Sequence, residues 1–360
     1  MKRLLSVVVA MSIMQSAFAQ ITITTADMPV SGDTLRYSFS SPTATTFSPA
    51  DSGTAMAWNY ALTPIAQGAD TFQTASSVNF AYLLLGLTAY GYKVADSFPG
   101  IGALLPGTSI KQIYTFFANS TSKYKADGFG ALIDGIPSPF SYTTADVWYF
   151  FPLTYGSTDS SDFKLNITVP SLGGIKEVGY RKTRVDGWGT ITTPFYPTPV
   201  NCIRVRSEIH QTDSVSIGTL FNFGIPANTV EYKWLVNGEH YPALWITSAV
   251  NPLTGAETVS NIRYRDSYRT IDTSSVNGVA QVNRNIAILK AFPNPAYSGV
   301  VTIDVPASWQ TFTIEVYDMQ QKLVASYANV RELNLQQLPA GQYVGRVVSG
   351  GNVGYVQIVK

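Results

Sequence analysis

The feature that most constrains the fold is the arrangement of β-forming residues in short runs. From Ile21 onward, Thr, Val, Ile, Tyr and Phe recur in stretches that are separated by Gly, Pro, Asn and Asp. No amphipathic segment of about ten or more residues has helical spacing. These patterns predict an all-β chain with a β-sandwich-type body of one or two subdomains. A smaller, immunoglobulin-like β-sandwich is expected at the C-terminus.

The clearest alternation runs from Cys202 to His210. One face carries Ile203, Val205 and Ile209, and the other face carries Arg204, Arg206, Glu208 and His210. Because successive side chains of a strand point to opposite faces, we expect one core face and one solvated face. The last four residues are candidates for a charged binding cluster, with a solvated surface as the plainer alternative.

Two further segments give specific expectations. Asn237-Gly238 separates two β-rich runs at 231–236 and 239–247, which predicts a hairpin closed by a type I′ turn with both turn residues at positive φ. Residues 78–92 are uncharged, and glycines at positions 86 and 91 disfavour a helix there. This segment is therefore predicted to form two strands, or one bent strand, buried on both faces.

Charge and composition exclude several classes of function. Lys and Arg number 24 against 23 Asp and Glu, so no basic field is available for a nucleic acid. One cysteine, Cys202, cannot form an internal disulfide, and we expect a buried thiol. Two histidines are too few for the usual zinc sites. No cofactor is predicted.

The first nineteen residues read as a secretory signal peptide. Lys2 and Arg3 precede an apolar run at 4–14, which is followed by the small-residue pattern Ala17-Phe18-Ala19. The apolar run is too short for a membrane-spanning helix, which needs about 20 residues. Cleavage is expected between Ala19 and Gln20, and the absence of a cysteine after that bond argues against a lipid anchor. The mature chain is predicted to contain no transmembrane segment.

The C-terminal part of the chain has the features of a separate domain. Residues 271–285 are rich in Ser, Thr, Asn and Val and lack aromatic residues, which predicts a linker between a body at 20–270 and a domain at 286–360. Strands of this domain are expected at 300–305, 312–318, 323–327, 341–348 and 354–359. Within the body, Gly173-Gly174 is the best candidate for a break between subdomains, near 173–180.

This domain resembles the type A C-terminal sorting domain of cargo of the type IX secretion system of Bacteroidetes. The resemblance covers residues 289–360 and rests on motifs at 292–295, 314–318, 322–324, 333–335, 338–343 and 356–360. Its motif residues are Phe292, Pro293, Asn294, Pro295, Gly299, Pro339, Gly341, Tyr343 and Lys360. One departure is Gln320-Gln321, where the family usually has a glycine-containing turn.

The resemblance implies a route and a location. Such cargo crosses the inner membrane, folds in the periplasm and then passes the outer membrane through the type IX secretion machinery, directed by its tail. The tail is commonly removed, and the cargo is attached to the cell surface or released. Within the body, residues 146–246 resemble blocks of secreted Bacteroidetes proteins that carry the same tail. This second resemblance implies no activity.

A short motif occurs twice in the body. Ala126-Asp-Gly-Phe-Gly is repeated 59 residues later as Val185-Asp-Gly-Trp-Gly. One interpretation is an Asp-Gly turn followed by an aromatic packing anchor. The alternative places Phe129 and Trp188 on the surface as stacking platforms for sugar rings.

Residues for catalysis, metal binding and modification are sparse. A glycosidase needs two carboxylates, and Asp127, Asp134, Asp146, Asp186, Glu208 and Glu231 are available, although no spacing selects a pair. Asp159 and Asp162 are candidates for a calcium site, which prefers oxygen ligands. Thr34 and Ser214 follow aspartates in tripeptides that resemble Bacteroidetes O-glycosylation sites.

The sequence thus predicts an exported surface or secreted protein whose body is a non-enzymatic binding or adhesion module for a polysaccharide or matrix component. Two alternatives stay open. A cleft with paired carboxylates would favour a secreted glycan-active hydrolase, and exposed, unpaired strand edges would favour a structural subunit of a surface matrix.

Overall fold

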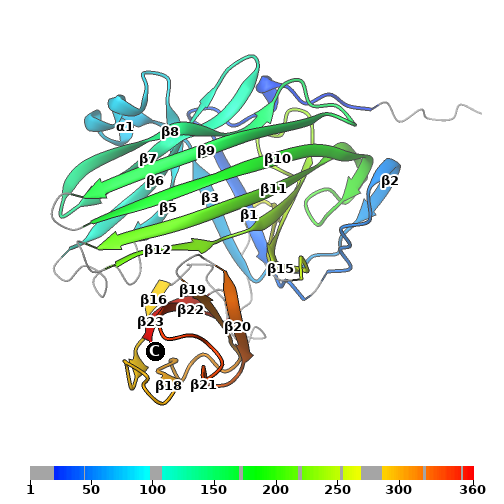
Figure 1. The fold of residues 1–360 in the computed structure, drawn as a ribbon. Coiled ribbons are helices and arrows are strands. Elements are labelled where there is room, and N and C mark those ends of the chain that lie inside the picture. The colour runs from blue at the N-terminus through cyan, green and yellow to red at the C-terminus, as the bar shows by residue number, and fades with distance from the viewer. Residues whose placement is uncertain are drawn as a thin grey trace, which may run out of the picture.

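The structure, a computed structural model, is built almost entirely from strands (Figure 1). It describes residues 20–43, 45–97, 108–169, 173–217, 221–251, 254–268, 286–318, 322–349 and 352–360. The signal peptide, the linker and the Gln320-Gln321 departure lie outside these ranges. Within them, none of the helices has the length and apolar character needed to cross a bilayer. The all-β prediction is confirmed.

Within the described residues, the body contains fifteen strands and three short helical segments. The helical segments are the 3-10 helices η1 (Thr25–Asp27) and η2 (Phe80–Leu85) and the single turn α1 (Ala75–Val78). The strands are β1 (Thr34–Ser40), β2 (Gly53–Asn59), β3 (Ala66–Thr71), β4 (Gln73–Thr74), β5 (Tyr90–Ser97), β6 (Ile110–Asn119), β7 (Lys123–Ile133), β8 (Ile136–Phe150), β9 (Thr158–Val169), β10 (Gly173–Thr192), β11 (Val200–Ile217), β12 (Phe221–Pro226), β13 (Thr229–Leu235), β14 (Leu244–Val250) and β15 (Glu257–Arg265).

All fifteen strands belong to one strongly curved sheet. Its main order is β3-β1-β15-β14-β13-β11-β10-β9-β8-β7-β6-β5-β4, with β12 paired to β11 and β2 paired to β10. The two ends of this order meet, because β3 and β4 are consecutive in the chain and only Phe72 separates them. The Phe72 ring lies 5.0 Å from that of Tyr92 on β5. The sheet therefore encloses an interior.

Residues on either side of the predicted break pair with each other. β9 and β10 form a long antiparallel ladder in which Gly173 is opposite Val169 and Arg184 is opposite Thr158. β10 also pairs with β11 along nearly its whole length. The chain on both sides of Gly173-Gly174 thus contributes to the same sheet.

Two apolar clusters lie on opposite faces of this sheet. The interior core includes Phe72, Phe117, Tyr124, Val205 and Trp245. The outer core lies on the other face of β11, β13 and β14, and includes Trp58, Cys202, Tyr232, Trp234 and Tyr264. The chain around β2 covers the outer core, since β2 runs parallel to β10 and Trp58 packs edge-on against Trp234. The central strands are therefore buried on both faces.

This second layer corrects the prediction for 202–210. Ile203 and Val205 do face the interior core, but the opposite face is not uniformly solvated. Arg204 is 0% exposed, and Cys202 beside it is buried as a free thiol, as predicted. Burial raises the pKa of the Cys202 thiol well above its ordinary range. Only Arg206, Glu208 and His210, nearer the other end of the strand, retain solvent contact.

The turn prediction at Asn237-Gly238 is half right. β13 and β14 do pair antiparallel, with Trp234 opposite Leu244. The connection is longer than two residues, and Gly238 has a φ of 72° while Asn237 is not at positive φ, so the turn is not type I′. The side chain of Asn237 instead donates to the Thr22 carbonyl at 2.7 Å. A tertiary contact with the N-terminal segment replaces the local turn.

The prediction of strands across 78–92 is wrong over most of its length. Residues 75–85 form α1 and η2, and β5 begins only at Tyr90. The side chains of Thr74 and Asn79 cap the two helical segments by accepting from Ser77 N and Ala81 N. Thr74 and Asn79 are residue types that often cap helices, and they were the sequence signal for α1 and η2 that the strand prediction overlooked.

The two copies of the repeated motif lie in strands at β-bulges, not in turns. Register shifts occur between Ala126 and Gly128 on β7 and between Val185 and Gly187 on β10. A Cβ atom on Gly130 would lie 2.8 Å from the Tyr82 ring of η2, and one on Gly189 would lie 1.9 Å from the Met56 carbonyl oxygen of β2. In both copies, the glycines allow another segment to lie directly on the sheet.

The C-terminal region forms two small sheets around its own core. The order in one is β16 (Ile286–Ile288), β23 (Asn352–Val359), β22 (Gln342–Ser349), β19 (Thr313–Asp318) and β20 (Leu323–Ala328). The other contains β17 (Ala291–Phe292), β18 (Val300–Ile303) and β21 (Glu332–Asn334). Five of these strands match the predicted runs closely. Ile303, Ile314, Leu333 and Val347, all fully buried, belong to the core.

Candidate functional site

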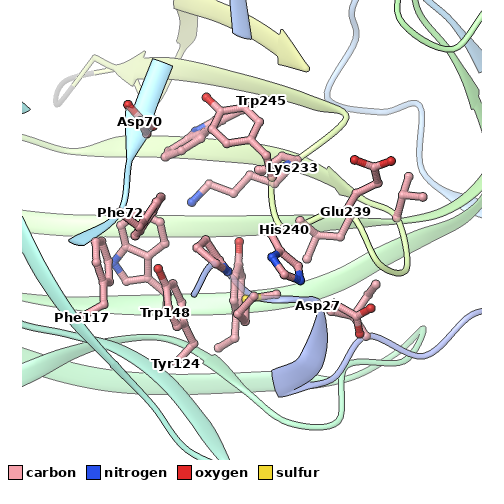
Figure 2. Close-up of a pocket in the computed structure, with 18 of the residues that line it drawn as sticks. Asp27, Asp70, Phe72, Phe117, Tyr124, Trp148, Lys233, Glu239, His240 and Trp245 are labelled. Carbon is pink, nitrogen blue, oxygen red and sulfur yellow. The ribbon is translucent and has the colours of Figure 1, made fainter. Parts of the chain in front are cut away.

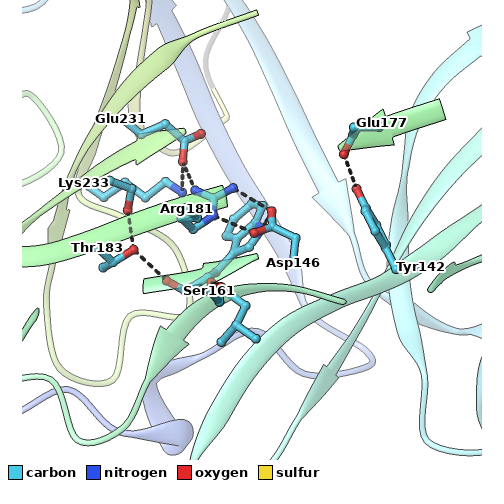
Figure 3. A network of polar contacts seen from close by, with 11 residues as sticks. Tyr142, Asp146, Ser161, Glu177, Arg181, Thr183, Glu231 and Lys233 are labelled. Atoms are coloured by element: carbon cyan, nitrogen blue, oxygen red, sulfur yellow. Dashed lines mark hydrogen bonds and ion pairs between the residues drawn. The ribbon is translucent and has the colours of Figure 1, made fainter. Parts of the chain in front are cut away.

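The interior contains a network of buried charges (Figure 3). The guanidinium of Arg181 on β10 donates from Nε and Nη2 to both carboxylate oxygens of Asp146 on β8, at 2.8 and 2.7 Å. Its Nη1 donates to Glu231 Oε2 at 3.0 Å, and Lys233 Nζ donates to the same oxygen at 2.9 Å. Alternation along β13 puts Glu231 and Lys233 on one face, so both point inward.

Lys233 lies between two indole rings. Its Nζ is 4.0 Å from the ring centre of Trp148 and 3.9 Å from that of Trp245. Burial lowers the pKa of Lys233 to about 8, although Glu231 opposes the change. Burial would raise the pKa of Glu231, but Lys233 and Arg181 lower it to about 2. The cation–π contacts and the ion pair that hold the amine therefore offset only part of the cost of burying its charge.

A small cavity adjoins Lys233 (Figure 2). Its volume is about 50 Å³, enough for a few water molecules but not for a sugar ring. Asp70 lines one side, and burial raises its pKa to about 6. His240 lines another side and places Nδ1 2.6 Å from Asp33 Oδ2. The size of this cavity argues against a substrate site in the interior.

Another carboxylate that faces the interior, Glu177, lies near the start of β10. Tyr142 on β8 donates to Glu177 Oε1 at 3.0 Å. Burial raises the pKa of Glu177 to about 7, and the nearby Asp213 adds to this rise. Sequence reasoning singled out neither Asp70 nor Glu177, because nothing in their local spacing distinguishes them from solvated strand residues.

These two carboxylates make the stability of the body depend on pH. The pKa of each is higher in the folded chain, about 6 against 3.8 for Asp70 and about 7 against 4.5 for Glu177. Between each pair of values the folded state binds more protons, so the free energy of unfolding falls as pH rises. We therefore expect the body to be more stable at pH 5 than at pH 7.5, with about 1.4 kcal/mol from Asp70 alone.

Denaturant unfolding followed by tryptophan fluorescence at the two pH values checks this expectation. Asp70→Asn with Glu177→Gln should remove most of the difference. Below about pH 4.5 the trend should reverse, because the Glu231 carboxylate then takes up a proton in the unfolded chain while it stays charged in the folded chain. An equal pH dependence in the double variant would contradict the assignment to these two groups.

Three of the predicted surface residues do lie together. On the outer face of β11, Arg206 forms an ion pair with Glu208 and another with Glu257 at 3.2 Å, and His210 Nε2 is 4.0 Å from Glu208. Arg204 does not join them. Its guanidinium is buried against both carboxylate oxygens of Asp186.

A groove adjoins His210 on the sheet formed by β8, β9, β10 and β11. Its volume is about 580 Å³. The ring of His210 stacks on that of Tyr180, with centres 4.7 Å apart and planes 21° apart. The lining residues are Thr144, Asp162, Phe163, Lys164, Val178, Gly179, Tyr180, His210, Gln211, Thr212 and Asn228. The groove thus combines an aromatic pair with several hydrogen-bonding side chains.

The aromatic residues of the repeated motif lie elsewhere. Trp188 is half-buried against the interior core. Phe129, also half-buried, packs with its ring 5.8 Å from that of Tyr142. These positions suit packing anchors better than exposed platforms for sugar rings.

Most of the carboxylates proposed for hydrolysis are paired with cations, and two of them, Asp146 and Glu231, bind the same guanidinium of Arg181. Asp146, Asp186, Glu208 and Glu231 bond to arginines or a lysine as described above, and Asp127 bonds to Lys125 Nζ at 2.5 Å. Asp134 accepts from Ser109 N at 2.7 Å. None of the six lines the cavity beside Lys233 or the groove next to His210.

The structure does not bring the two calcium candidates together. Asp159 is opposite Thr183 and Asp162 is opposite Tyr180, and three residues apart on β9 they point to opposite faces. In the described ranges, no group of three or more His, Cys, Asp or Glu side chains could hold a metal ion. Thr34 is exposed at the start of β1, and Ser214 lies within β11, so O-glycosylation at these residues stays a prediction.

The motif residues of the C-terminal domain meet at one corner. The Asn294 side chain donates to Gln357 O at 2.9 Å and accepts from Val359 N at 2.8 Å. Gly341 and Lys360 exchange backbone hydrogen bonds at 3.0 and 2.9 Å. Three motifs far apart in sequence therefore hold each other in place.

Other motif residues complete this corner. The Tyr343 hydroxyl donates to Pro339 O at 2.6 Å. Gly299 has a φ of 72°, and a Cβ atom there would lie 2.9 Å from the Gln336 side chain. Pro293 and Pro295 follow cis peptide bonds, and Phe292 is 53% exposed. Most motif residues thus build the corner, while Phe292 leaves part of its ring free for a partner.

Comparison with known proteins agrees with this assignment of the tail. Residues 290–360 match the family model of the secretion system C-terminal sorting domain. Searches of the curated proteins and of the solved structures gave no match. The chain therefore carries a type IX sorting domain of the Bacteroidetes kind at its C-terminus, which implies passage through that secretion machinery to the cell surface or the medium.

Proposed function

We propose that the body is a non-enzymatic glycan-binding module that the sorting domain delivers to the cell surface or the medium. The groove over β8 to β11 is the observation that carries this proposal. Its volume of about 580 Å³ falls in the range of small-molecule sites. It is large enough for a short stretch of polysaccharide, unlike the cavity beside Lys233.

The side chains of the groove suit a sugar ligand. A sugar ring has an apolar face, which packs on an aromatic ring, and hydroxyl groups, which exchange hydrogen bonds with polar side chains. The stacked Tyr180 and His210 offer the first kind of contact. Asp162 and Asn228 offer acceptors and donors for the second. Lys182 Nζ lies 5.3 Å from the Tyr180 ring and extends the polar rim.

The charges of the groove favour binding over hydrolysis. Among its lining residues Asp162 is the one carboxylate, whereas retaining and inverting glycosidases both use two. Asp70 and Glu177, whose pKa values are raised most among the described carboxylates, are held inside the body by Tyr37 and Tyr142. A bound sugar would therefore be held without an acid and a base on either side of a glycosidic bond.

Affinity electrophoresis of the chain from Gln20 in gels containing xylan, pullulan or mixed-linkage β-glucan tests this proposal. At least one polysaccharide should retard the protein, and Tyr180→Ala with His210→Ala should abolish the retardation. The matched control is Arg184→Ala, an exposed residue of β10 outside the groove lining, which should leave it unchanged.

Three results would overturn the proposal. Equal retardation of the double variant would place binding elsewhere. Release of reducing sugar from a retarding polysaccharide would make the protein a hydrolase. Growth of the protein into large polymers without any polysaccharide, measured by light scattering, would favour the structural matrix subunit.

A further inference from the structure

The outward face of η2 carries a compact apolar patch. Phe80 is 80% exposed, Leu84 is 79% exposed and Leu87, just beyond the helix, is 88% exposed. No charged residue occurs between Asp70 and Lys93. Large apolar side chains exposed singly are ordinary, but three on one short projecting segment mark a site of interaction. We call Phe80, Leu84 and Leu87 the η2 patch.

The segment that carries the patch is firmly seated. Tyr82 and Leu85, on the inward side of η2, are 1% and 7% exposed and pack with Phe116. Gly128 and Gly130 on β7 make room for them, since a Cβ atom on either would lie 2.8 Å from the Leu85 or Tyr82 side chain. The outward exposure of the η2 patch is therefore a fixed feature of the fold.

The size and charge of the patch decide between candidate partners. Its three side chains expose roughly 400 Å² in all, taking about 150–200 Å² for each full side chain. A stable interface between two proteins needs about 800 Å² from each partner, so the patch is too small for a second copy of this chain. A bilayer sets no such minimum, because each apolar side chain can enter the acyl region independently.

We propose that the η2 patch inserts into the surface of a lipid bilayer and holds the body against a membrane. The side chains would reach the boundary between head groups and acyl chains, about 5–10 Å deep. Since the segment from 71 to 92 carries no charge, the attraction is apolar and independent of lipid charge. α1, which leads into η2, lies at an extremity of the body, where a flat surface can approach it (Figure 1).

Vesicle co-sedimentation with the chain from Gln20 to Lys360 tests this proposal, since residues 1–19 would bind lipid by themselves. The protein should sediment with phosphatidylcholine vesicles equally at low and high salt. Phe80→Ser, Leu84→Ser and Leu87→Ser together should lower the partition coefficient at least about tenfold. The matched control is Tyr268→Ser with Tyr297→Ser, which removes two side chains that are 76% and 90% exposed elsewhere and should change nothing.

A second measurement locates the contact. In a Phe80→Trp variant, vesicles with brominated acyl chains should quench fluorescence more strongly than in the parent protein. Failure of the parent to sediment, loss of sedimentation at high salt, or equal sedimentation of the triple variant would each overturn the proposal. So would a dimer that only the triple variant lacks. The Tyr180 and His210 variant should still sediment, which separates this proposal from glycan binding.

Discussion

Replacing Asp186 by Ala is expected to lower the free energy of unfolding of the body by about 3–5 kcal/mol. Arg204 is 0% exposed, and its Nε and Nη2 donate to the two oxygens of Asp186 at 2.8 and 2.9 Å. The same Nη2 donates to Pro49 O at 2.9 Å. Without Asp186 the guanidinium charge stays buried between the sheet and the segment around β2, with no carboxylate beside it.

The repeated motif provides a matched control for this prediction. Asp127 has the same place in the first copy, but its partner Lys125 has a side chain that is 37% exposed. Asp127→Ala should therefore cost less than about 1 kcal/mol. Urea denaturation followed by tryptophan fluorescence measures both values. Equal losses in the two variants would show that burial does not set the strength of the Asp186 pair.

A second variant separates the charge from the packing. Asp186→Leu with Arg204→Met removes both charges and fills similar space, and such replacements of buried ion pairs are often neutral or stabilising. The double variant should therefore recover most of the stability that Asp186→Ala loses. A loss as large as that of the single variant would mean that the ion pair itself is required.

Gly189→Ala is expected to detach β2 from the sheet and to cost about 3 kcal/mol or more. A Cβ atom at 189 would lie 1.9 Å from the carbonyl oxygen of Met56 and 2.5 Å from its backbone nitrogen. These are backbone atoms that pair with β10, so they cannot move aside as a side chain would. The outer core beneath Trp58 would then be open to solvent.

Limited proteolysis together with denaturant unfolding checks this second prediction. Gly189→Ala should be cut within residues 45–62 much faster than the parent. Gly187→Ala should have an intermediate effect, because its Cβ would lie 3.0 Å from the Trp58 side chain and 3.4 Å, an ordinary contact distance, from the Gly53 backbone nitrogen. Gly341→Ala has open space around the new methyl group and should behave like the parent. An intact β2 in Gly189→Ala would contradict the assigned contact.

The sequence predicted the strands better than the layers. Alternation between Cys202 and His210 fixed which side chains share a face, and the structure agrees. It did not reveal that the chain near Trp58 covers one face, because that contact joins residues about 150 positions apart in sequence. Arg204 was therefore predicted to be solvated, and its burial follows from the second layer around β2, which local periodicity cannot encode.

The other predictions from local sequence failed because contacts between distant segments decided the structure. At 78–92 the apolar composition suggested burial on both faces, whereas within η2 Phe80 and Leu84 point to solvent and only Tyr82 and Leu85 are buried. The repeated Asp-Gly suggested turns, whereas its glycines allow η2 and β2 to lie on the sheet. The groove was also missed, because Tyr180 and His210 come from different strands and only the pairing of β10 with β11 brings them together.

The tail was predicted most completely, because its motifs describe a whole domain. The contact of Asn294 and Gly341 with the last strand has a consequence for the timing of export. A ribosome makes the chain from its N-terminus, so the body is finished well before β23 and Lys360 exist. Until that last strand is added, Asn294 lacks its partners at 357 and 359 and Gly341 lacks Lys360. A truncated chain that stops before β23 would thus have an incomplete sorting domain. The secretion machinery would therefore receive only chains whose body had already been translated.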